Sequence, residues 1–108
     1  MTRGTTPTIT LTIKGYDLSS NTNYVTISQA NGTSLTLVGE SVVASYDSDT
    51  ETSTLQIYLS QEQTLSFSRK QNADIQLRTI DSEGTALASK IYHLNVNAIL
   101  LDGVIEYA

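Results

Sequence analysis

The segment ADIQLRTIDSEGTALASKIYHLNV, residues 73–96, contains the pattern that decides the fold. Apolar and polar residues alternate in two runs, and a period of two is typical of strands that bury one face. The turn DSEG lies between the runs, and its glycine can adopt the positive φ that such turns require. The segment therefore predicts an antiparallel hairpin whose core-facing residues are Ile75, Leu77, Leu87 and Ile91.

The same alternation recurs along the preceding part of the chain. Asn31-Gly32 favours a tight hairpin because both residues tolerate positive φ. Residues 60–63 interrupt the alternation as a single helical turn, and 64–67 suit an edge strand or a crossover. Short strands with turns every 8–12 residues predict an all-β fold, an immunoglobulin-like two-sheet antiparallel β-sandwich of about seven strands. The earlier strands are expected at 8–14, 23–29, 34–39, 42–47 and 54–60.

Length and composition limit the possible classes of protein. The chain has 108 residues, the size of one domain, and no cysteine for disulfides or thiolate chemistry. Its net charge of −5 and scattered basic residues argue against nucleic-acid binding. No apolar run approaches the roughly 20 residues that span a membrane, and no signal-peptide pattern opens the chain. We expect synthesis and assembly in a cytoplasm, without a membrane partner.

The chain divides into a sandwich domain at 1–96, which includes an N-terminal arm, and a tail at 97–108. The tail is dense in apolar residues, and chain ends fray unless another element holds them. Two alternatives stay open: the tail adds a strand to its own sheet, or it packs on another subunit. The residues expected to make such a subunit contact are Leu100, Leu101, Val104, Ile105 and Tyr107.

Few residues suggest site chemistry. Asp47, Asp49 and Glu51 alternate like the carboxylates of a calcium loop, but the sharp-turn glycine and the distal glutamate of an EF-hand are missing. An acidic, solvated hairpin tip explains them better. His93 is the single histidine, and no serine lies in a G-x-S-x-G context. The sequence therefore predicts neither an enzyme nor a cofactor or metal.

The order of several motifs resembles that of a known group of proteins. RGTTPT at 3–8, LSQEQTL at 59–65 and the hairpin from Ile75 to Ser89 occur in this order. They resemble small proteins encoded in phage and prophage structural regions of Firmicutes, which begin with a similar Arg-Gly-Thr-Thr-Pro-Thr motif. More distantly, the chain is similar to the N-terminal sandwich domain of phage baseplate upper proteins. It departs from the group in residues 39–54 and in its tail.

The resemblance implies a non-enzymatic virion component of the tail, the baseplate or the head–tail connection, assembled in the bacterial host cytoplasm. Its expected partners are other phage structural proteins and further copies of itself. A polar first strand entered through a flexible arm suits pairing along a neighbouring subunit. The alternatives are a receptor- or glycan-binding sandwich module that uses tyrosine rings, and an acidic prophage regulator. The arm residues expected to make assembly contacts are Arg3, Gly4, Thr5, Thr6 and Pro7.

Overall fold

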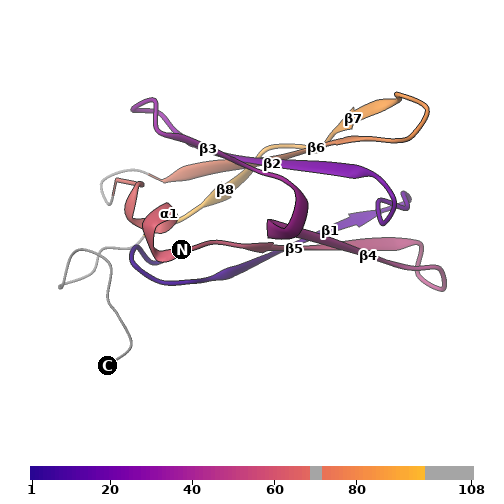
Figure 1. Ribbon diagram of the computed structural model, residues 1–108, viewed down its shortest axis with the longest axis horizontal. Coiled ribbons are helices and arrows are strands. Elements are labelled where there is room, and N and C mark those ends of the chain that lie inside the picture. The colour runs from indigo at the N-terminus through magenta and orange to yellow at the C-terminus, as the bar shows by residue number, and fades with distance from the viewer. Residues whose placement is uncertain (69–71, 97–108) are drawn as a thin grey trace.

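Two antiparallel sheets pack face to face in the computed structural model, which describes residues 1–68 and 72–96 (Figure 1). The smaller sheet has the order β1-β5-β4, and the larger has the order β3-β2-β6-β7, with β8 also pairing with β6. The strands of the smaller sheet are β1 (Thr8–Lys14), β5 (Thr52–Tyr58) and β4 (Val42–Asp47). Those of the larger sheet are β3 (Ser34–Leu37), β2 (Thr22–Gln29), β6 (Ala73–Ile80), β7 (Ala86–Ala88) and β8 (Tyr92–Leu94).

This strand order confirms the predicted sandwich. In an immunoglobulin-like domain, strands B, E and D form one sheet and C, F and G the other. The sheets β1-β5-β4 and β3-β2-β6-β7 follow this scheme, with β3 as the additional strand beside β2. Among the described residues no strand corresponds to strand A, so β1 pairs only with β5. The smaller sheet has three strands and the larger has five, but β7 and β8 both lie along β6, so the smaller sheet is one strand position narrower among the described residues.

Alternating side chains of both sheets make up the core. On the central strands, Leu55 and Ile57 of β5 meet Val25 and Ile27 of β2, and all four are fully buried. Strand β6 adds Ile75 and Leu77, as the sequence predicts. Most polar strand residues face outward, with Asn23, Ser53 and Thr79 among the buried exceptions, and burial of one face fixes the register of the pairs.

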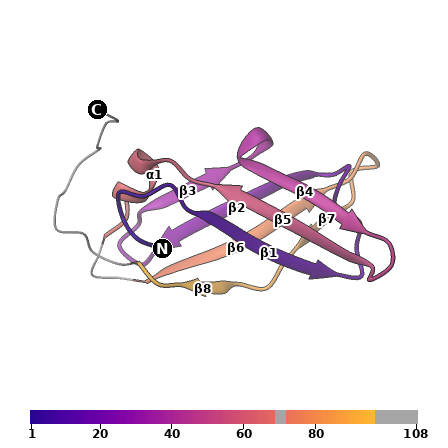
Figure 2. The same cartoon turned by 90° about the horizontal axis from the view of Figure 1, so that it is seen from below.

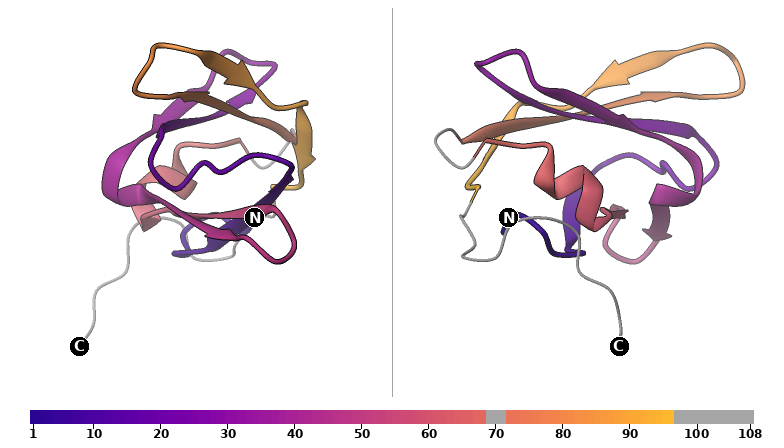
Figure 3. Two further views of the ribbon diagram at one scale, coloured as in Figure 1. Left: turned by 90° about the vertical axis from the view of Figure 1, so that its right-hand side faces the viewer. Right: turned by 60° about the vertical axis from the view of Figure 1, so that its left-hand side comes forward.

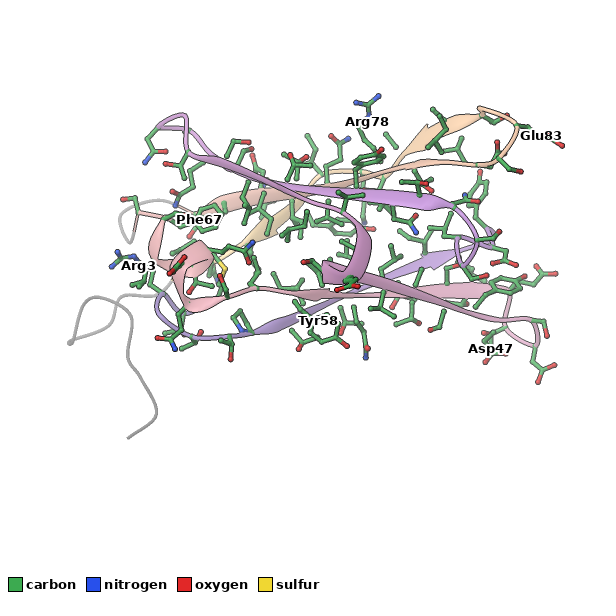
Figure 4. The ribbon with its side chains drawn as sticks, in the orientation of Figure 1. Arg3, Asp47, Tyr58, Phe67, Arg78 and Glu83 are labelled. Atoms are coloured by element: carbon green, nitrogen blue, oxygen red, sulfur yellow. The ribbon has the colours of Figure 1, made fainter. Side chains whose placement is uncertain are left out.

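A short helix closes one end of the sandwich. Helix α1 (Gln61–Leu65) begins at Ser60, whose hydroxyl accepts the Gln63 amide, while the Gln63 side chain accepts the Ser60 amide. This capping box stabilises the helical turn expected at 60–63. Phe67, which follows the helix, is 1% exposed and fills the core beneath it (Figure 4). The segment 64–67 is therefore a core-filling crossover and not an edge strand.

Both predicted hairpins form, each through a turn with one left-handed glycine. The Gly32 amide donates to Gln29 O and the Gly84 amide to Asp81 O, and φ is 96° at Gly32 and 87° at Gly84. Asn31 does not adopt the positive φ expected from the Asn-Gly pair. In the β2–β3 turn, Gly32 is therefore left-handed and Asn31 is not.

The last arm of the sheet differs from the single strand expected after Gly84. It divides into β7 and β8, both paired with β6, because Ser89 interrupts the ladder. The Ser89 amide donates to Leu77 O at 2.8 Å, and its hydroxyl accepts the Leu77 amide at 3.0 Å. The predicted burial of Ile91 is wrong, since this side chain, between the two strands, is 54% exposed.

Candidate interaction surfaces

The N-terminal segment is held against its own domain. The Arg3 guanidinium donates from Nε to Phe67 O at 2.7 Å and from Nη2 to Leu65 O at 3.1 Å. These carbonyls lie at the C-terminal end of α1, where a cation interacts favourably with the unpaired carbonyl groups. Arg3 is thus an anchor of the domain rather than part of a free arm.

Further contacts hold the rest of the predicted arm beside α1. The Thr64 hydroxyl donates to Thr5 O at 3.0 Å, and the Leu59 amide donates to Pro7 O at 3.3 Å. Gly4 adopts a φ of 72°, which turns the chain here. The side chains of Thr5 and Thr6 remain exposed. An assembly contact through this segment stays a prediction, with Thr5 and Thr6 as its accessible part.

The tail residues predicted to contact another subunit lie outside the described residues. These are Leu100, Leu101, Val104, Ile105 and Tyr107. The described chain ends at Val96, which is 7% exposed and belongs to the hydrophobic core.

The acidic turn at 47–51 forms a hairpin tip at the end of the sandwich away from Arg3 (Figure 4). Asp47 Oδ1 accepts the Asp49 amide at 3.0 Å, and Glu51 adopts a left-handed φ of 52°. All three acidic side chains are exposed. No group of three or more histidine or acidic side chains converges for a metal within residues 1–68 and 72–96.

His93 lies on β8 directly opposite Asp74 of β6. Its Nδ1 is 2.7 Å from Asp74 Oδ1. The side chains are 84% and 54% exposed. This pair is an ordinary cross-strand contact on the solvent face of the sheet.

A groove on the open flank of the sandwich is the feature that the sequence did not indicate. It has a volume of about 380 Å³ and lies between the end of β1 and the β7–β8 edge. Figure 2 shows that β1 and β8 lie on the same side of the molecule. Leu77 and Leu18 are buried at the groove, whereas Leu87 is 42% exposed.

The groove lies where the smaller sheet has no fourth strand among the described residues. Leu87 pairs with the buried Thr79, and paired residues of antiparallel strands face the same side of a sheet. Leu87 therefore faces inward as predicted, but no strand of the smaller sheet covers it among the described residues. The right-hand view of Figure 3 shows the β6–β7 hairpin extending away from the smaller sheet. For this reason Leu87 is 42% exposed although it faces inward.

Two lysines and two tyrosines line the same groove. Lys90 Nζ lies 5.1 Å from the centre of the Tyr92 ring, within cation–π range. Lys14 and Tyr16 enter from the end of β1. Ser53, fully buried, fixes this wall, because its hydroxyl donates to Tyr16 O and accepts the Leu18 amide.

A second hollow, slightly smaller in volume, lies on the outer face of the larger sheet. Its volume is about 340 Å³, and its lining includes Tyr24, Arg78 and Thr36. Tyr24 is 40% exposed and pairs directly with Arg78 across the β2–β6 ladder. A flat aromatic ring beside a fork of guanidinium donors can contact a polar ligand with an apolar face.

No family model matches this chain, and no curated protein has a significantly similar sequence. Within residues 1–68 and 72–96, no helix has the length and apolar character needed to cross a membrane.

Proposed function

We propose that this chain is a non-enzymatic structural subunit of a bacteriophage virion. It belongs to the tail, the baseplate or the head–tail connection, and it acts through contacts with other structural proteins and with copies of itself. The support from sequence is the resemblance carried by residues 3–8, 59–65 and 75–89. The support from geometry is the edge of β1, which pairs only with β5 among the described strands and borders an apolar groove.

An edge of this kind favours association through the backbone. Unpaired N–H and C=O groups of an edge strand accept an added strand, and a neighbouring groove accepts its side chains. Such contacts need no catalytic group.

Mass spectrometry of purified phage particles tests the proposal. We expect peptides of this chain at a stoichiometry above one copy per particle, because virion subunits commonly form symmetric rings. Absence from particles that contain their other structural proteins would overturn the proposal. Light scattering on the purified chain gives a second test, since a strict monomer at high micromolar concentration would argue against self-association.

A receptor- or glycan-binding module is the second candidate function. The observation that favours it is the hollow beside Tyr24 and Arg78 on the outer face of the larger sheet. NMR titration with soluble cell-wall oligosaccharides tests it, with Tyr24→Ala as the variant that should lose binding. The matched control is Tyr58→Ala, because Tyr58 is similarly exposed, at 43%, on the other sheet (Figure 4). Equal shifts in the two variants would exclude the hollow as the ligand site.

A further inference from the structure

We propose that residues 97–108 of a second copy of this chain add as a strand to the open edge of β1 and fill the neighbouring groove. This inference rests on the proposed function in assuming that the chain assembles with itself. It names the segment and the surface through which the copies associate.

The groove lies where a further strand of the smaller sheet would pair with β1. Strand β1 pairs with β5 on one side and with no described strand on the other. Across the groove, Leu87 faces inward from β7 and remains 42% exposed. An added strand beside β1 covers Leu87 and completes a four-stranded sheet opposite the larger one. Burial of apolar surface and new backbone hydrogen bonds both favour this addition.

The groove also contains a buried polar atom that lacks a partner. Thr79 lines it and is 5% exposed, yet its Oγ1 has no hydrogen-bond partner among the described residues. Its direct cross-strand neighbour, Asn23, has an equally unpartnered Oδ1. Buried polar groups are normally hydrogen-bonded, and leaving one unpaired destabilises the fold. The donors and acceptors of an added strand are suitable partners for such atoms.

The sequence of residues 97–108, NAILLDGVIEYA, fits this groove as a strand. Ile99, Leu101, Ile105 and Tyr107 occupy alternate positions, with Gly103 between the two pairs, and share one face of an extended segment. This face suits an apolar groove floor. The other face carries Asp102 and Glu106 together with Leu100 and Val104.

The positive charge of the groove also favours the acidic tail as its occupant. The two basic groups of the groove, Lys14 and Lys90, are two of only six basic residues in a chain of net charge −5. No acidic side chain is among the described residues that line it. An added tail brings Asp102 and Glu106 to the rim, where each carboxylate can pair with an ammonium group.

The path of the chain after β8 favours the tail of a second copy, rather than the chain's own tail, as the occupant of the groove. The groove lies beside Leu77 and Thr79 of β6, whereas Tyr92 pairs with Ile75 and Leu94 with Ala73. The chain therefore moves away from its own groove as it approaches Val96. The tail has one glycine, Gly103, and no proline. If the chain reverses at Gly103, the five residues that follow span at most about 17 Å. This length is less than that of the six residues leading outward, so the tail does not reach back to its own groove.

Disulfide trapping in full-length protein tests this proposal, because the chain has no cysteine of its own. One variant carries Thr12→Cys on the outer face of β1, and its partner carries Leu100→Cys or Val104→Cys, on the tail face expected to lie outward beside it. Mixed under mild oxidation, the two variants should give a disulfide-linked dimer. The control replaces Thr12→Cys with Val43→Cys, an exposed residue on the opposite edge strand β4. The yield from Val43 should be at background level.

Each outcome has a defined meaning. A dimer yield no higher than that of the Val43 control overturns the proposal. A chain carrying both Thr12→Cys and Leu100→Cys that closes internally, as a monomer, shows that the tail fills its own groove and also overturns the proposal. Detection of the chain in virions without any cross-link would remove this inference and leave the proposed function intact.

A charge exchange gives an independent test. Lys14→Glu with Lys90→Glu should lower the dimer yield by about two- to fivefold for each lost ion pair. Asp102→Lys with Glu106→Lys on the tail partner should restore it. Lack of restoration, with both variants folded by circular dichroism, would contradict pairing between the lysines and the tail.

Discussion

Two buried threonines of this domain differ in the partners of their hydroxyl groups. Thr64, fully buried, donates to Thr5 O and to Gln61 O, each at 3.0 Å. Thr79, 5% exposed, has no hydrogen-bond partner among the described residues. The two residues therefore allow the same substitution to be compared in opposite environments.

We expect Thr64→Val to lower the free energy of unfolding by about 1–2 kcal/mol, because it removes the hydrogen bonds of a buried hydroxyl to two partly buried carbonyls. Thr79→Val removes a hydroxyl without a partner and should leave stability unchanged or raise it by up to about 1 kcal/mol. Urea unfolding of dilute protein measures both. Equal losses in the two variants would show that Thr79 has a partner in solution.

Hydrogen bonds from a single residue, Ser19, shift the pKa of the Asp17 carboxyl. The Ser19 hydroxyl, at 2.6 Å, and then the Ser19 amide, at 3.0 Å, donate to Asp17 Oδ1 and lower the pKa of this carboxyl. A lowered pKa in the folded state means that the carboxylate stabilises the fold fully above the unfolded-state pKa. This contribution is lost as the pH falls through the folded-state pKa.

The wild type should consequently lose stability relative to Asp17→Asn as the pH falls through the acidic range. Urea unfolding at a series of pH values measures the difference between the two proteins. NMR titration of the Asp17 carboxyl gives its pKa directly. A pKa above that of an unstructured aspartate would contradict the two hydrogen bonds.

At the scale of elements, the β6–β7 hairpin depends on left-handed backbone at one residue. Gly84 has a φ of 87°, and a Cβ added there meets nothing within 4 Å. Gly84→Ala should therefore cost about 1–2 kcal/mol through backbone strain alone. Gly84→Asn should cost less, because asparagine tolerates this conformation. Thermal unfolding measures both, with Ser82→Ala in the same turn as the control, and a neutral Gly84→Ala variant would mean that the turn rearranges.

The sequence predicts the strands well because each one alternates over four or more residues. It predicts the last arm poorly, because the hydrogen bonds between Ser89 and Leu77 that divide this arm depend on tertiary pairing. The exposure of Leu87 was not predictable either. Alternation indicates which way a side chain faces, whereas burial also requires a strand on the opposite sheet.

At the scale of the whole molecule, the candidate surfaces lie at different parts of one sandwich. Arg3 is bound at the α1 end, and the Asp47 and Glu83 turns lie at the opposite end (Figure 4). The groove lies on the flank between the sheets. The RGTTPT stretch could be noticed from sequence, but its attachment to α1 carbonyls depends on the helix that follows β5. The sequence did not predict the groove. The groove results from the different numbers of described strands in the two sheets, which alternation within a single strand does not indicate.

Both sheets share one core, so they should unfold together. Leu55 of β5 is fully buried and Leu77 of β6 is 2% exposed, and the two sheets contribute to one hydrophobic cluster. Leu55→Ala and Leu77→Ala should each lower the free energy of unfolding by about 2–5 kcal/mol. A domain of this size has a total of about 5–15 kcal/mol, so each variant loses a large share of its stability.

Far-UV circular dichroism and tyrosine fluorescence should follow one coincident urea transition in both variants, as expected for two-state unfolding. Val43→Ala is the matched control, because Val43 is 47% exposed on the outer face of the smaller sheet and should change stability by less than about 0.5 kcal/mol. Two separate transitions in Leu55→Ala, with a single one in Leu77→Ala, would show that the narrower sheet opens alone. In that case strand addition at the open edge of β1 would compete with local unfolding of the smaller sheet.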